Sequence, residues 1–157
     1  MVTKVLFIGN RIAGDDGIGS RLYDELKDEP KLKDVKIIEA GVMGLDIISY
    51  FEETDRLIFV DAIHLENNKN IGDVILFSED RLPKEVKVLS QHDFGLEQTL
   101  SLLRVAMPRL EKTNIIGIVV GDVKVMVRGL SKELEKNLGK IKDDVLNKIM
   151  MVVKSKK

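Results

Sequence analysis

The stretch KVLFIGNRIAGDDGIGSRL, residues 4–22, contains a strand, a glycine-rich loop and the start of a helix in direct succession. The apolar run at its start predicts a strand over 4–9. A helix is predicted from about Asp16, because apolar residues recur at every fourth position: Ile18, Leu22, Leu26. A strand that passes through a short loop into a helix is typical of an α/β sheet.

The rest of the chain repeats this alternation. Further β-branched, apolar runs predict strands over 35–40, 56–63, 72–78 and 114–120. Helical spacing predicts helices over 44–51 and 94–107, and a final helix capped by Ser131 whose apolar residues include Leu134, Leu138, Ile141, Val145, Ile149 and Val152. The connection 79–93 is long for a compact domain, which is typical of functional loops. Residues 121–130 are expected to form a loop or a short extra strand.

The run RLIFVDAI, residues 56–63, is the most apolar of the strands and predicts a central position, buried on both faces. We therefore expect one domain over 1–157 with an α/β, doubly wound, mostly parallel five-stranded sheet of order 2-1-3-4-5 and helices on both faces. In such sheets ligands bind outside the carboxyl ends of the strands.

Composition excludes several function classes. The formal net charge of −1 offers no basic excess to neutralise phosphates, so we expect no nucleic-acid partner. Cysteine is absent, which removes thiol nucleophiles and thiolate zinc sites. The longest apolar run, IIGIVVG at 115–121, is far shorter than the roughly 20 residues of a membrane span, and the first residues do not resemble a signal peptide. We expect a cytoplasmic protein without membrane contact.

Acidic residues and one histidine are predicted to meet at the carboxyl edge of the sheet. Asp15 and Asp16 follow the first strand, Asp61 lies near the carboxyl end of the third, and His92 and Asp93 lie in the long connection. The loop does not match G-x-G-x-x-G, and adjacent carboxylates would repel a pyrophosphate. An oxygen and nitrogen metal site of Asp16, Asp61 and His92 remains as the functional interpretation.

Other interpretations of these residues stay open. Asp15 or Asp16 could cap the first helix, and Asp61 could be a turn residue at a strand end. His64 is interpreted as a loop histidine. A phospho-acceptor receiver domain also places acidic residues after strands one and three, but its lysine closely follows strand five, whereas Lys124 comes late. A non-catalytic metal-binding module is a further alternative.

Four short motifs together resemble the endopeptidases that mature the large subunit of nickel–iron hydrogenases. A strand ending in GN precedes DDGIG, an apolar strand ends in DA, HDFGL opens a helix, and GLS precedes the last helix. The resemblance extends over nearly the whole chain. It implies a peptidase that removes a C-terminal peptide from a hydrogenase large-subunit precursor. Separately from the resemblance, we expect a monomer.

The resemblance also implies roles for individual residues. Asp16, Asp61 and His92 would bind nickel held by the substrate, which cadmium or zinc could replace in crystals. From the residues themselves, and not from the resemblance, we expect Asp93 to orient His92 and Asp15 to support the same site from outside the ligand set. The family's GGT-like segment corresponds to EAGVMG at 39–44, where Gly41 is kept and Val42 replaces threonine, and these two residues would contact substrate.

Overall fold

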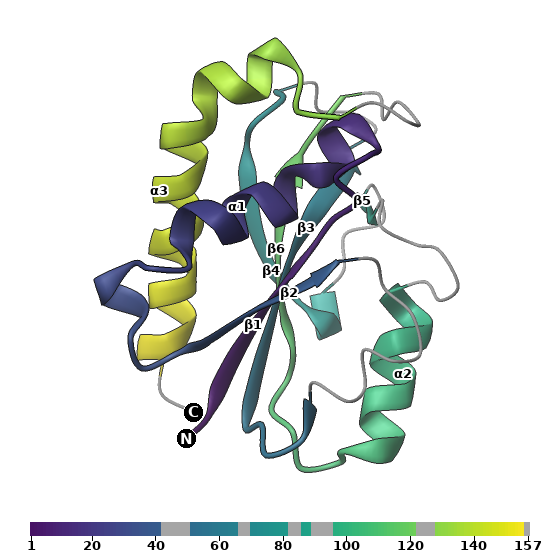
Figure 1. Ribbon diagram of the computed structural model, residues 1–157. Helices are drawn as coiled ribbons and strands as arrows, with labels where there is room; N and C mark the ends of the chain where they lie inside the picture. Colours follow the sequence, from purple (N-terminus) through teal and green to yellow (C-terminus); the bar gives the residue numbers. More distant parts are fainter. Residues whose placement is uncertain (42–50, 66–69, 82–85, 89–95, 122–127, 156–157) are drawn as a thin grey trace.

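The computed structural model describes residues 1–41, 51–65, 70–81, 86–88, 96–121 and 128–155 (Figure 1). The strands are β1 (Thr3–Ile8), β2 (Lys36–Gly41), β3 (Arg56–Leu65), β4 (Val74–Ser78), β5 (Val86–Val88) and β6 (Asn114–Val119). The helices are α1 (Ile18–Leu26), α2 (Leu96–Ala106) and α3 (Lys132–Lys154), with short 3₁₀ turns η1 (Gly14–Gly17), η2 (Pro30–Leu32) and η4 (Glu79–Arg81). The expected helix over 44–51 lies almost wholly outside the described residues.

The sheet confirms the expected class and corrects its order. Its main path runs β2-β1-β3-β6-β4, and β5 pairs with β3. The pairs β1–β2, β1–β3 and β3–β6 are parallel, whereas β4 and β5 run antiparallel to their neighbours. The expected order placed the strand at 72–78 inside the sheet, but that strand is β4 and lies at the edge. The expected long connection 79–93 also contains η4 and β5.

The position of β4 has a physical cause. A parallel crossover needs a dozen or more residues, usually with a helix, and only residues 66–73 separate β3 from β4. The strand therefore returns antiparallel. Between the two competing strands, the nearly fully buried β6 takes the central place beside β3, and the half-buried β4 takes the edge.

Two apolar layers cover the sheet, because alternate residues of each strand point to opposite faces. Val5 and Phe7 of β1 pack under α1 and α3, whereas Leu6 and Ile8 pack with α2. Figure 1 shows α1 and α3 on one side of the sheet and α2 on the other. The expected helical stripes are confirmed as core, including Ile18, Leu22 and Leu26 of α1 and all six apolar positions expected in α3.

Both ends of α3 are fixed by polar contacts. At its start the Ser131 side chain accepts a hydrogen bond from the Leu134 N–H, as expected for an N-cap. At its end the buried guanidinium of Arg56 donates to the carbonyl oxygens of Val152, Val153 and Ser155, and Arg56 Nε lies 2.8 Å from a carboxylate oxygen of Glu111. Within the described ranges, no helix has the length and apolarity needed to cross a membrane.

Candidate functional site

The loop after β1 is closed by its own backbone. The Asn10 N–H donates to the Asp16 carbonyl at 3.0 Å, the Ala13 N–H donates to Asn10 at 3.1 Å, and the Asp16 N–H donates back to Ala13 at 3.2 Å. These bonds fold residues 10–16 into a compact turn. Asp15 and Asp16 are therefore held on η1 at the end of the strand.

Glycines in this loop serve close packing and a tight turn. A Cβ added at Gly19 would lie 1.9 Å from the Ile8 carbonyl oxygen, so α1 can approach the end of β1 only without a side chain there. Gly14 begins η1 with φ of 58°, in the left-handed region that favours glycine. The glycine-rich stretch thus brings η1 and α1 against the end of the strand.

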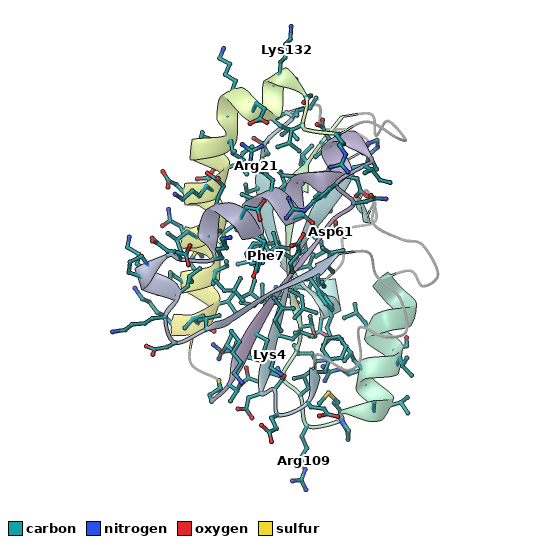
Figure 2. All side chains as sticks on the ribbon, viewed as in Figure 1. Lys4, Phe7, Arg21, Asp61, Arg109 and Lys132 are labelled. Carbon is teal, nitrogen blue, oxygen red and sulfur yellow. The ribbon has the colours of Figure 1, made fainter. Side chains whose placement is uncertain are left out.

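Asp16 and Asp61 are both buried at the carboxyl edge of the sheet. Asp16 is 3% exposed and Asp61 is 1% exposed. Phe7 pairs with Val60, so Asp61 is level with the last residue of β1, and η1 lies against β3. One oxygen of Asp61, Oδ1, accepts the N–H of Ala62 at 2.7 Å. Figure 2 shows Asp61 near the middle of the molecule, where these strands meet the loop.

Asp15 does not cap the first helix, and it makes a long-range hydrogen bond instead. Its Oδ1 accepts the backbone N–H of Ser131 at 2.7 Å, although 116 residues separate the two. Asp15 is 5% exposed. The N-cap positions of η1 and α1 are Ala13 and Gly17, so neither aspartate caps the first helix. Asp15 instead joins the acidic loop to the N-terminus of α3.

The remaining predicted residues are only partly described. His92, Asp93 and Val42 lie outside the described residues, as does Lys124 of the receiver alternative. Gly41 ends β2 beside the loop, where its carbonyl accepts the Gly9 N–H at 2.8 Å. His64 is not a loop residue, because it lies in β3 with Nε2 2.6 Å from the Gly121 carbonyl oxygen.

The described part of the site supplies carboxylates from η1 and β3. Among the described residues, no three side chains of His, Cys, Asp or Glu are grouped closely enough to hold a metal ion. Asp16 and Asp61 offer hard oxygen donors, which suit a divalent cation in combination with further ligands. The predicted third ligand, His92, lies in the sequence between β5 and α2, outside the described residues.

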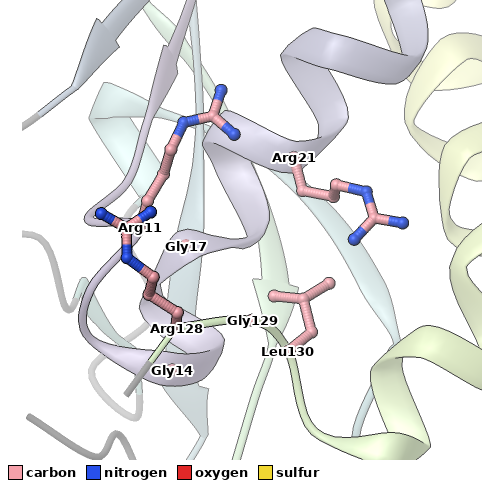
Figure 3. A pocket seen from close by; sticks show the side chains of 7 residues that line it. All are labelled: Arg11, Gly14, Gly17, Arg21, Arg128, Gly129 and Leu130. Atoms are coloured by element: carbon pink, nitrogen blue, oxygen red, sulfur yellow. The ribbon is translucent and has the colours of Figure 1, made fainter. Parts of the chain in front are cut away.

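A pocket of about 170 Å³ adjoins the acidic loop (Figure 3). Its lining residues are Arg11, Gly14, Gly17, Arg21, Arg128, Gly129 and Leu130. The hydrogen bonds that Arg11 donates to Asp24 are the main cause that raises the pKa of Arg11, and those that Arg21 donates to Glu135 raise the pKa of Arg21. No sequence pattern marks these arginines, although the motif GLS directly follows Arg128.

Comparisons with known proteins agree with the fold and the motifs. The model of the family "HycI: Hydrogenase maturation protease" matches residues 20–148. The Hydrogenase 2 maturation protease of Escherichia coli is 28% identical over 133 residues, which cover 83% of this chain and 80% of that protein. A hydrogenase expression/formation protein, HupD of Bradyrhizobium diazoefficiens, is 35% identical over 100 residues, or 62% of this chain and 51% of that protein.

Solved structures show the same architecture. The hydrogenase maturating endopeptidase HybD from Escherichia coli superposes with a TM-score of 0.75 at 24% identity, covering 97% of this chain and 94% of that chain. HybD from Thermococcus kodakarensis gives a TM-score of 0.74 at 24% identity, covering 94% and 98%. The family match spans most of the chain and replaces the receiver-domain alternative. This chain belongs to the hydrogenase maturation protease family.

Proposed function

We propose that the protein is the endopeptidase that removes the C-terminal extension of a nickel-loaded [NiFe] hydrogenase large-subunit precursor. Family membership and two buried aspartates, Asp16 of η1 and Asp61 of β3, support this proposal. The observation that carries the site assignment is the burial of these two carboxylates where η1 lies against β3, because paired hard oxygen donors suit a divalent cation.

In this proposal the nickel ion belongs to the precursor and is recognised together with it. Asp16, Asp61 and His92 contact the ion, and Asp93 orients His92. The ligand set contains no thiolate and only one imidazole, so we expect the free enzyme to hold nickel weakly. The complete site then exists only in the complex, and a precursor without nickel is rejected.

The reaction is hydrolysis of one peptide bond. Water adds across the scissile C–N bond, which leaves a new carboxylate on the large subunit and a new amine on the released peptide. Two routes fit the residues: the substrate's metal polarises the scissile carbonyl, or it orients the attacking water. In this proposal Gly41, which ends β2, and Val42, the next residue in the sequence, contact the peptide.

The test compares nickel-loaded and nickel-free precursors by mass measurement. We expect wild-type enzyme to shorten only the loaded precursor, and Asp16→Asn, Asp61→Asn and His92→Ala to process it poorly. His64→Ala is the matched histidine control, because it removes only the contact to Gly121. Efficient cleavage of nickel-free precursor in the presence of a chelator would contradict the proposal, as would equal behaviour of the two histidine variants.

A further inference from the structure

The pocket beside η1 brings three guanidinium groups together from separate parts of the chain. Arg11 comes from the loop after β1, Arg21 from α1, and Arg128 from the approach to α3. Figure 3 shows Arg11 and Arg128 together on one side of the pocket and Arg21 on the other. The backbone of η1, through Gly14 and Gly17, forms another wall. The acidic loop and the arginines are thus parts of one surface.

Two of these arginines already bind carboxylates of this chain. Arg11 donates to Asp24 at 2.8 and 3.0 Å and to Glu39 at 3.0 Å. Arg21 makes a two-point contact with Glu135 at 2.9 and 3.1 Å. These contacts orient both side chains and neutralise their charges. Neither arginine has a full positive charge left for a ligand.

Arg128 differs from both. Within the described part of the chain its guanidinium makes no hydrogen bond or ion pair, and the residue is exposed. Its backbone position is nevertheless fixed close by, because the Ser131 N–H three residues later is bound by Asp15. The acidic loop therefore places this free cation at the pocket.

The charges around the pocket favour a ligand with one negative charge. Among the described residues, the guanidinium of Arg128 has no carboxylate partner, while Asp24 and Glu39 pair with Arg11 and Glu135 pairs with Arg21. A dianionic phosphate would meet these carboxylates and the neighbouring Asp15 at close range. A planar carboxylate matches the fork of N–H donors on one free arginine and needs only that one charge.

We propose that this pocket binds an acidic side chain of the peptide substrate through a two-point contact with Arg128. The inference rests on the proposed function for the identity of the substrate, which is the precursor. Arg128 is then a specificity residue beside the cleavage site. It selects precursors that carry a glutamate or aspartate at the position that reaches the pocket, and it takes no part in breaking the bond.

The first experiment measures binding without requiring activity. The probe is N-acetylglutamate α-amide, with the glutamine analogue as its uncharged control, titrated into isotope-labelled protein by NMR. We expect saturable shifts of the Arg128, Gly129 and Gly14 amide signals with the glutamate probe only. Arg128→Gln should abolish them. Arg109→Gln should not, because this exposed arginine lies at the other end of the molecule (Figure 2).

The second experiment uses nickel-loaded precursor. We expect Arg128→Gln to raise KM about tenfold with kcat unchanged, as for loss of one charge-assisted contact made equally in ground and transition states. Arg109→Gln should leave both constants unchanged. Replacing the acidic residues of the precursor singly by their amides should identify one position at which Arg128→Gln has no further effect.

The results separate this inference from the proposed function. A wild-type protein without saturable shifts overturns the pocket assignment, even if the precursor is processed normally. An Arg128→Gln variant whose KM equals that of Arg109→Gln overturns the substrate assignment. If wild-type enzyme leaves the loaded precursor uncut, the proposed function fails, while the NMR titration still decides whether the pocket binds a carboxylate.

Discussion

Two charged side chains of β3 are buried, and they differ in the groups that surround them. Arg56, its first residue, is 4% exposed and donates to Glu111 and to three carbonyl groups at the end of α3. Asp61, five residues later, lies at the edge where Asp15 and Asp16 are also buried. Arg56 therefore pairs with an opposite charge, whereas Asp61 lies in a region with other buried carboxylates.

We interpret the first charge as structural and the second as part of the proposed site. The contacts of Arg56 tie α3 to the sheet. Asp61 and Asp16 are assigned in our proposal to the substrate's cation, for which two hard oxygen donors are suited. The comparison predicts opposite outcomes when the charge is removed at each place.

The largest effect is expected for Asp61→Asn. Processing of loaded precursor should fall by about 100-fold or more, because an amide has no charge to offer a cation and cannot act as an acid or base. The free energy of unfolding in urea should change little, because the amide keeps the shape of the side chain and an oxygen that can accept the Ala62 N–H. Asp16→Asn should behave alike. A variant that loses stability but keeps full specific activity would show that Asp61 is structural, like Arg56.

Arg56→Met tests the buried charge at the start of β3. The free energy of unfolding should fall by about 3–5 kcal/mol, because Glu111 and the carbonyls of α3 are left buried without their donor. Activity per folded molecule should be unchanged. Arg109→Met, an exposed change of the same kind, should alter stability little. Urea denaturation gives the stabilities, and equal values for the two methionine variants would contradict the assignment.

Asp15→Ala is expected to have a smaller, mixed effect. It leaves the Ser131 N–H without its acceptor, which should cost about 1–3 kcal/mol of stability. It should also raise KM for the precursor, since the segment holding Arg128 loses its attachment to the loop. Ser131→Ala is the matched control: it removes the cap of α3, worth about 1 kcal/mol, and keeps the N–H that Asp15 accepts. Equal KM values for Asp15→Ala and Ser131→Ala would show that Asp15 does not influence the pocket.

Much of the fold could be predicted because its signals are local. Spacing within α1 and α3 identified the buried faces, and the unbroken apolar run of β3 identified a central strand. The sheet order could not be obtained from spacing alone, because β4 and β6 compete for the same neighbour. Counting residues 66–73 would have excluded a parallel crossover and moved β4 to the edge.

The site was predictable to a lesser degree. The rule on carboxyl ends of strands correctly brought Asp16 and Asp61 to one edge. No local pattern marks the bond between Asp15 and Ser131 or the pocket around Arg128, since both join residues more than a hundred positions apart. Such contacts follow from the way α3 returns across the sheet, which the sequence does not specify locally.

The smallest expected effect concerns the exposed pair of Arg11 and Asp24. Its contribution to the free energy of unfolding can be compared with those of the buried charges. The hydrogen bond from Arg11 lowers the pKa of Asp24 below its ordinary value. Its contribution to stability is therefore present above the unfolded-state pKa of about 3.9 and is lost as pH falls through the lower folded-state pKa. The side chains are 44% and 40% exposed, so Asp24→Asn should cost less than about 1 kcal/mol at pH 7.

That cost should shrink below pH 4 and in about 1 M salt, where exposed charges are screened. Glu25→Gln is the matched control, an exposed carboxylate on the same helix with no hydrogen bond or ion pair among the described residues. Urea denaturation of both variants across pH supplies the measurement. If the Asp24→Asn cost grew on acidification, or matched that of Glu25→Gln throughout, the pair would not anchor Arg11, and the charges around the pocket would need a different assignment.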